Sequence, residues 1–179
     1  MLFKLENFFD RFSDVMGWIA GLLNIVMLVN VFYDAIMRYF FRTGSIAMQE
    51  MEWHLFAVVF LFGMSFALKE DGHVRVDIFY DHFSPRWKAI VNISGTLFFL
   101  LPLGFLIIEG SIWYVKEAYI LHEISGDPGG LPYRWLIKAV IPTSFVFLVV
   151  SAMGFIIHNI NIFRGVEAPP VHHIEDDVL

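Results

Sequence analysis

Four long stretches without Asp, Glu, Lys or Arg constrain the fold of this 179-residue chain more than any other feature of its sequence. These stretches cover residues 15–33, 53–68, 89–108 and 139–163. A helix needs about 20 apolar residues to cross the ~30 Å hydrocarbon core of a bilayer, and the four stretches are of about that length. We therefore predict four membrane-spanning helices, at about 15–37, 46–68, 85–115 and 133–160.

The composition favours a membrane protein over a soluble helical bundle. Apolar residues make up 58% of the chain and charged residues 17%, whereas soluble domains have about 45–50% and about 25%. A soluble bundle would also need polar helix faces, but the third and fourth stretches are apolar on all sides. The sequence thus predicts an all-α integral membrane protein.

The chain ends give two further expectations. Leu5, Phe8, Phe9 and Phe12 recur at helical spacing opposite polar residues, which predicts an amphipathic helix lying in the membrane interface before the first span. A simple extension of the first span is the alternative. Residues 165–179 contain proline and are acidic, so we expect a disordered tail after a membrane domain at 1–164.

Basic residues are unequally distributed between the two sides of the predicted bundle. Seven Lys and Arg residues lie on the side of both termini and the 69–88 loop, and five lie on the opposite side. The positive-inside rule then places both termini in the cytoplasm, by a narrow margin.

Asn30, Asp34 and Arg38 form a polar stripe at the end of the first span, because they are spaced four residues apart. Ionisable groups are costly in a bilayer, so we expect these side chains to face protein or the interface. A substrate or ion site is one interpretation. Interfacial anchoring with an Asp34–Arg38 pair, or contact with another polypeptide, is the favoured one.

Metal and haem sites are weakly supported. Glu50 and Glu52 point about 200° apart on a helix, and Glu50 with His54 supplies only two ligands, so we expect no metal site. A haem needs axial ligands such as histidine, but His54 and His158 are expected at opposite membrane faces and cannot share one haem. A haem held with a partner chain remains an alternative.

Small residues and prolines interrupt the predicted spans. Gly17, Gly21 and Gly63 are placed for close helix packing. Pro102 and Pro142 lie inside the third and fourth spans, where each removes a backbone donor and favours a kink. The chain has no phosphate-binding loop and no recognisable nucleophile with a base, so we expect neither an enzyme nor a nucleic-acid-binding protein.

Several short motifs follow one another in a characteristic order. They are Arg38 with Phe41, Gln49-Glu50, Glu52-Trp53, Gly63, His73-Val-Arg-Val-Asp77, Leu131-Pro132 and Ile141-Pro142. Together with the chain length and the number of spans, they resemble the small membrane subunit (DctQ type) of tripartite ATP-independent periplasmic (TRAP) transporters. The resemblance covers most of 22–157 and excludes the acidic tail.

The resemblance implies a division of labour in a bacterial inner membrane. A soluble periplasmic protein would capture an organic acid or related solute, and a large multi-span subunit would carry it inward with sodium. The small subunit would scaffold the large one and help to dock the binding protein. The residues that match the family, and that we would assign to subunit contacts and helix-end anchoring, are Arg38, Glu50, Glu52, Trp53, His73 and Asp77.

The residue pattern itself agrees with an accessory role. The chain has no pair of inverted halves and no interrupted span with polar residues at mid-depth, which are typical of a transport site. The alternative function is a membrane anchor for a haem-containing redox complex. A Soret band in the purified protein would favour that alternative, and co-purification with a large multi-span protein would favour the transporter subunit.

Overall fold

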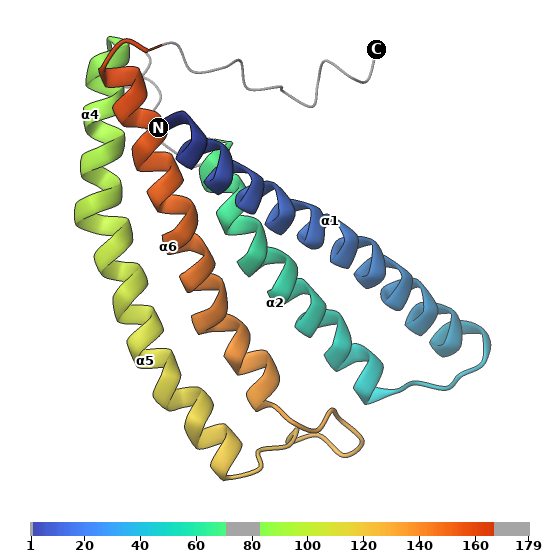
Figure 1. Cartoon of the computed structure of the whole chain (residues 1–179). Helices are drawn as coiled ribbons and strands as arrows, with labels where there is room; N and C mark the ends of the chain where they lie inside the picture. Colours follow the sequence, from blue (N-terminus) through green and yellow to red (C-terminus); the bar gives the residue numbers. More distant parts are fainter. Residues whose placement is uncertain (1, 71–82, 167–179) are drawn as a thin grey trace, which may run out of the picture.

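The computed structural model describes residues 2–70 and 83–166, so His73, Asp77 and nearly all of the acidic tail lie outside the described residues. It is all-helical in that part of the chain (Figure 1). The elements are α1 (Leu2–Phe40), α2 (Ile46–Lys69), α4 (Pro85–Gly95), the π-helical turn η1 (Thr96–Leu100), α5 (Leu101–Ile120) and α6 (Trp135–Phe163). Since α4, η1 and α5 follow one another without a break, residues 2–70 and 83–166 contain four helices long and apolar enough to cross a membrane, which confirms the predicted number.

The N-terminal segment is part of the first long helix. Helix α1 runs without interruption from Leu2 to Phe40, and the described residues contain no separate interfacial helix before it. The expectation of a separate amphipathic helix was therefore wrong, and the alternative of an extended first span describes the structure. The reason is that Glu6 and Ser13 are buried against α6, where they contact His158, Asn161 and Ser151.

Helix α6 is the centre of the bundle. It lies between α2 and the α4–α5 helix in Figure 1, and it also packs against α1. A small buried core forms around Leu68, Leu148 and Ala152. Most other large apolar side chains point outward, as expected where lipid replaces water as the solvent.

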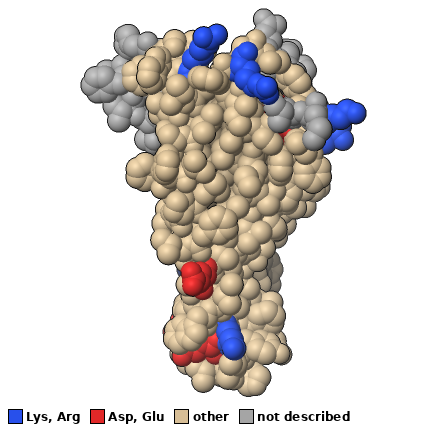
Figure 2. Space-filling model, turned by 60° about the vertical axis from the view of Figure 1, so that its left-hand side comes forward, with Lys and Arg blue, Asp and Glu red and all other residues tan. Residues whose placement is uncertain are grey.

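Charged side chains concentrate at the two ends of the bundle. Figure 2 shows Lys and Arg at the upper end and charges of both signs at the lower end of one face. The broad band between these ends is uncharged except for one acidic patch. This distribution matches a protein whose long axis crosses the hydrocarbon layer.

Each intramembrane proline has a different local effect. Pro102 follows the π-helical turn Thr96–Leu100, in which the amide of Leu101 bonds the carbonyl of Thr96. A π-turn of this kind accommodates the backbone where proline leaves a carbonyl without its usual donor. Pro142 lies inside α6, which continues through it.

Candidate functional site

The end of α1 is tied to the start of α2 by the polar stripe predicted from the sequence. Asn30 Nδ2 donates a hydrogen bond to the carbonyl of Met48 at 3.0 Å. One turn later, buried Asp34 lies 3.0 Å from the Arg38 guanidinium, although the two groups are not aligned for a hydrogen bond. Asn30 and Asp34 therefore face protein, and the Arg38 side chain is about half exposed at the helix end.

Glu50 holds the loop between α5 and α6. Its side chain is buried in the first turns of α2, and it accepts hydrogen bonds from the Ser125 hydroxyl and the Leu131 amide. Gly130 lies so close that an added Cβ would be 2.8 Å from Glu50 Oε2 and closer still to Ser125. Both carboxylate oxygens of Glu50 are therefore engaged with this loop, and His54 contacts the Glu50 backbone carbonyl rather than its carboxylate.

The same end of the bundle holds a basic and aromatic group on three helices. Lys138 on α6 forms an ion pair with Glu123, and its ammonium lies 3.9 Å from the ring centroid of Tyr114 on α5. The guanidinium of Arg134 lies 5.7 Å from the ring centroid of Trp53 on α2. Such cation–π contacts join α2, α5 and α6 where the bundle would meet the membrane interface.

Three buried side-chain atoms at this end have no hydrogen-bond partner in the part of the chain that the structure describes. They are Oδ2 of Asp34, Oε1 of Glu52 and Nε of Arg134. The Asp34 and Arg134 atoms nevertheless lie in ion pairs, with Arg38 at 3.0 Å and with Glu123 at 3.8 Å. Buried donors and acceptors are normally paired, so unpaired ones often mark a contact that is missing from the isolated chain. Glu52 and Trp53 are neighbours near the start of α2. Among the described residues, Trp53 contacts the Arg134 guanidinium with its ring.

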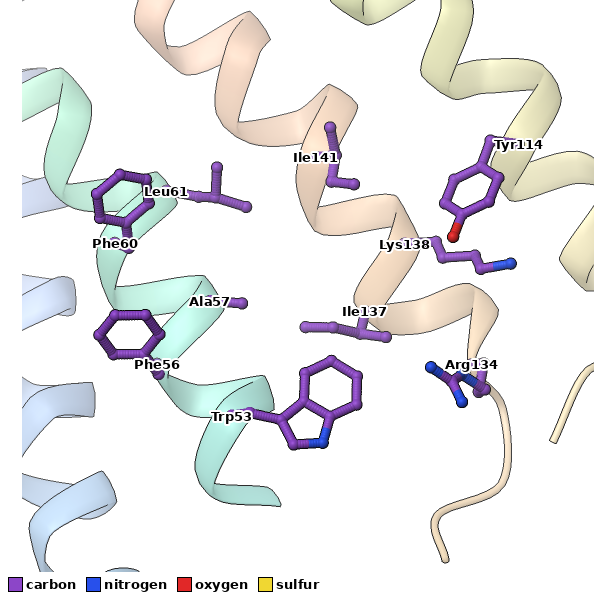
Figure 3. Close-up of a pocket in the computed structure, with 10 residues that line it drawn as sticks. All are labelled: Trp53, Phe56, Ala57, Phe60, Leu61, Tyr114, Arg134, Ile137, Lys138 and Ile141. Atoms are coloured by element: carbon purple, nitrogen blue, oxygen red, sulfur yellow. The ribbon is translucent and has the colours of Figure 1, made fainter. Parts of the chain in front are cut away.

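A hollow of about 500 Å³ opens beside this group (Figure 3). Trp53 and Arg134 stand at one end of it, and the α2 and α6 side chains that continue from them are apolar. The ten lining residues are Trp53, Phe56, Ala57, Phe60, Leu61, Tyr114, Arg134, Ile137, Lys138 and Ile141.

The opposite end of the bundle has its own buried polar contacts, which join α1, α4 and α6. Glu6 accepts hydrogen bonds from His158 Nδ1 at 2.7 Å and from Asn161 Nδ2 at 2.5 Å. Asn92 on α4 donates to Asn159 on α6 at 2.9 Å. These contacts join α1 and α4 to the C-terminal end of α6.

A second pair of contacts attaches α1 deeper in the bundle. The Ser13 hydroxyl donates to the Ser151 hydroxyl at 2.9 Å, and Lys69 at the end of α2 forms an ion pair with Asp14. Directly beside these polar contacts, Phe12 packs edge-on against Phe147 on α6.

The glycines differ in what surrounds them. A Cβ at Gly17 would lie 2.6 Å from the Phe66 ring, so α1 and α2 approach closely there. A Cβ at Gly21 or Gly63 would meet no atom within 4 Å. Gly154, which the sequence analysis did not single out, allows α1 to approach α6, because a Cβ there would lie 2.5 Å from Phe9 Cβ.

The two span-bordering histidines lie far apart, as the even-numbered spans predicted. His54 is near the start of α2 and His158 near the end of α6, at opposite ends of the bundle in Figure 1. Within 2–70 and 83–166, no three His, Asp or Glu side chains are grouped to hold a metal ion. What the described polar residues can do is to join helices at the two ends of an apolar bundle.

Sequence reasoning missed several of these residues. Helical spacing predicted no contact for Glu6, Glu123, Ser125, Gly130 or Lys138. Their partners lie 15 to 155 positions away in the chain, beyond the reach of helical spacing. The i, i+4 spacing of Arg134 and Lys138 beside a predicted turn was the one local signal of a basic group.

The chain is similar over most of its length to known transporter components. Residues 27–161 match the family of tripartite ATP-independent periplasmic transporters, DctQ component. A TRAP transporter small permease protein of Haemophilus influenzae is 28% identical over 169 residues, covering 92% of this chain and 98% of the relative. A second such protein of that organism is 22% identical over 150 residues, covering 84% and 88%. The chain therefore belongs to the DctQ family, the small permease component of TRAP transporters, and is a multi-pass transport protein rather than an enzyme.

Proposed function

We propose that this chain scaffolds the large membrane subunit of a sodium-coupled TRAP transporter for organic acids or related solutes, and that it helps to dock the periplasmic binding protein. The observation that carries the proposal is the placement of its polar groups. Each of the four long helices contains a charge-free stretch. The buried ionisable groups Glu6, Asp34 and Glu50 lie near the ends of the helices that carry them. A subunit that carried a polar solute would need polar groups near mid-depth.

The ends of the bundle support the docking part of the proposal. Glu50 holds the 14-residue loop between α5 and α6 (121–134) by hydrogen bonds to Ser125 and Leu131, and backbone hydrogen bonds from Ser125 to Leu131 and from Arg134 to Glu123 close the loop on itself. An ordered loop can present a constant surface to a soluble protein, because its binding does not have to offset the entropy of ordering the loop. With both termini in the cytoplasm, this loop would face the periplasm.

Co-purification tests the scaffold role. The chain is expressed with the large membrane subunit from the same transporter, and an affinity tag on this chain should recover both in a mild detergent. Reconstituted with the binding protein, the pair should take up solute only under an inward sodium gradient. If the tagged chain is recovered alone while the large subunit folds and transports without it, the scaffold proposal is wrong.

The orientation can be tested separately, because the chain contains no cysteine. In intact spheroplasts, a membrane-impermeant maleimide should label Asp127→Cys in the α5–α6 loop and leave Lys4→Cys unlabelled until the membrane is opened. The reverse pattern would place the termini in the periplasm and exclude the loop as a docking surface for a periplasmic protein.

A further inference from the structure

One side of the bundle carries a groove between α2 and the α4–α5 helix, with α6 as its floor. The hollow in Figure 3 forms one half of this groove. A second hollow of about 500 Å³ continues it, lined by α2, α6 and the α4–η1–α5 rod. The lining residues of α2 follow a single helical stripe through both hollows, as do those of α6, so the hollows lie end to end on the same helix faces.

The groove is as long as a membrane is thick. Its floor extends from Arg134 to Phe155, which are 21 residues apart, or about 32 Å at the helical rise of 1.5 Å per residue. The hydrocarbon core measures about 30 Å, so the groove spans both leaflets. A phospholipid reaches only from one interface to the bilayer centre, whereas a transmembrane helix fills such a length.

The chemistry of the groove is apolar with one basic end. Among its lining residues, the charged ones are Arg134 and Lys138, and both lie at the Trp53 end. Both cations form ion pairs with Glu123, but Arg134 Nε lies 3.8 Å from the Glu123 carboxylate and makes no hydrogen bond within the described residues. An occupant that is apolar along its length and brings a hydrogen-bond acceptor to Arg134 would complement the groove.

The groove walls are also sterically open. Phe60 on α2 exposes 63% of its surface and Phe99 in η1 exposes 77%. Gly95 lines the second hollow, and a Cβ there would meet no atom within 4 Å. Helices in membranes associate by close van der Waals packing, for which such a grooved surface is suited.

We infer that this groove is the seat of a transmembrane helix of the large membrane subunit, whose end carries a carboxylate or a free backbone carbonyl beside Arg134. The inference rests on the proposed scaffold function and adds where the contact is made. It places the partner against α2, α6 and the α4–α5 helix, and leaves the outer face of α1 to lipid.

A matched pair of substitutions tests the inference. Gly95→Leu fills the groove, and Gly21→Leu adds the same side chain to the outer face of α1, where a Cβ also meets no atom within 4 Å. Overpacking an interface should lower recovery of the large subunit with Gly95→Leu by about tenfold or more, and Gly21→Leu should leave it within about twofold of wild type. Circular dichroism and thermal melting of each isolated chain establish that both variants are folded.

Cross-linking identifies the occupant directly. A benzophenone maleimide on Phe60→Cys should form an adduct with the large subunit, while the same label on Phe32→Cys, which is 67% exposed on α1, should not. An adduct of Phe60→Cys with phospholipid alone, or with a second copy of this chain, would overturn the inference. Normal assembly of Gly95→Leu would overturn it while leaving the scaffold function intact, whereas failure of the wild-type chain to bind the large subunit would overturn both.

Discussion

The contact of Glu6 with α6 decides whether the N-terminal part of α1 belongs to the bundle. Glu6 exposes only 3% of its surface, and it accepts hydrogen bonds from His158 and from Asn161, which is itself 2% exposed. Glu6→Ala removes both acceptors at once. It leaves a buried amide and an imidazole without their partner on α1.

The expected loss of stability follows from these two bonds. Hydrogen bonds to charged groups contribute about 1.5–3 kcal/mol each in soluble proteins, and side-chain bonds in membrane bundles contribute about 0.6 to about 1.7 kcal/mol. Taking about 1.5 kcal/mol for each bond, Glu6→Ala should lower the free energy of unfolding by about 3 kcal/mol. Glu6→Gln keeps one acceptor and should lose about half as much.

The measurement is equilibrium unfolding of the purified chain in mixed micelles, followed by circular dichroism. Asn7→Ala is the control, because Asn7 is the exposed neighbour of Glu6 on the same turn and should change the unfolding free energy by less than about 0.5 kcal/mol. If Glu6→Ala is no more destabilising than Asn7→Ala, the first turns of α1 are not held by α6. An amphipathic helix lying in the interface would then describe this segment better than the continuous bundle helix.

Three further substitutions test other contacts. Gly154→Val should separate α1 from α6 and lower the melting temperature by several degrees, while Gly21→Val, which adds a side chain to open space, should not; equal shifts would contradict the packing. Gly130→Ala should release the α5–α6 loop and speed its cleavage by thermolysin, which cuts before Leu and Ile residues such as Ile124, so a cleavage rate equal to wild type would show that Glu50 does not need this glycine. Arg38→Ala should lower the yield of the complex with the large subunit more than it alters solute choice, and a changed specificity with intact assembly would contradict the anchoring role.

The long-range plan of the fold could be predicted from the sequence because the hydrocarbon layer imposes a length and a composition on every span. The charge-free stretches 53–68 and 139–163 lie within α2 and α6, and Gly44-Ser45 marks where α2 begins. The order of motifs around Glu52-Trp53 also identified the family, which a match over residues 27–161 supports.

The tertiary contacts could not be predicted in the same way. Helical spacing says which residues share a face, but it does not say which helix that face meets. Phe9 and Glu6 lie in a segment whose amphipathic pattern is equally typical of an interfacial helix. What favours packing of this segment on α6 is the absence of a side chain at Gly154 and the amide of Asn161, which donates to Glu6. Glu50 resembled half of a metal site because its partner, Ser125, lies 75 residues away.

The π-helical turn at Thr96–Leu100 has a consequence for how this chain should be compared with its relatives. Such a turn accommodates one residue more than an α-helix of the same length, so it rotates everything after it by about 100° relative to what precedes it. Removing one residue here would restore a regular helix and turn Tyr114 away from Lys138. Insertions and deletions are tolerated in the loops between spans, but we expect them to be rare among relatives at this turn inside the membrane. A relative that lacks the extra residue must join its third and fourth spans through a different set of side chains.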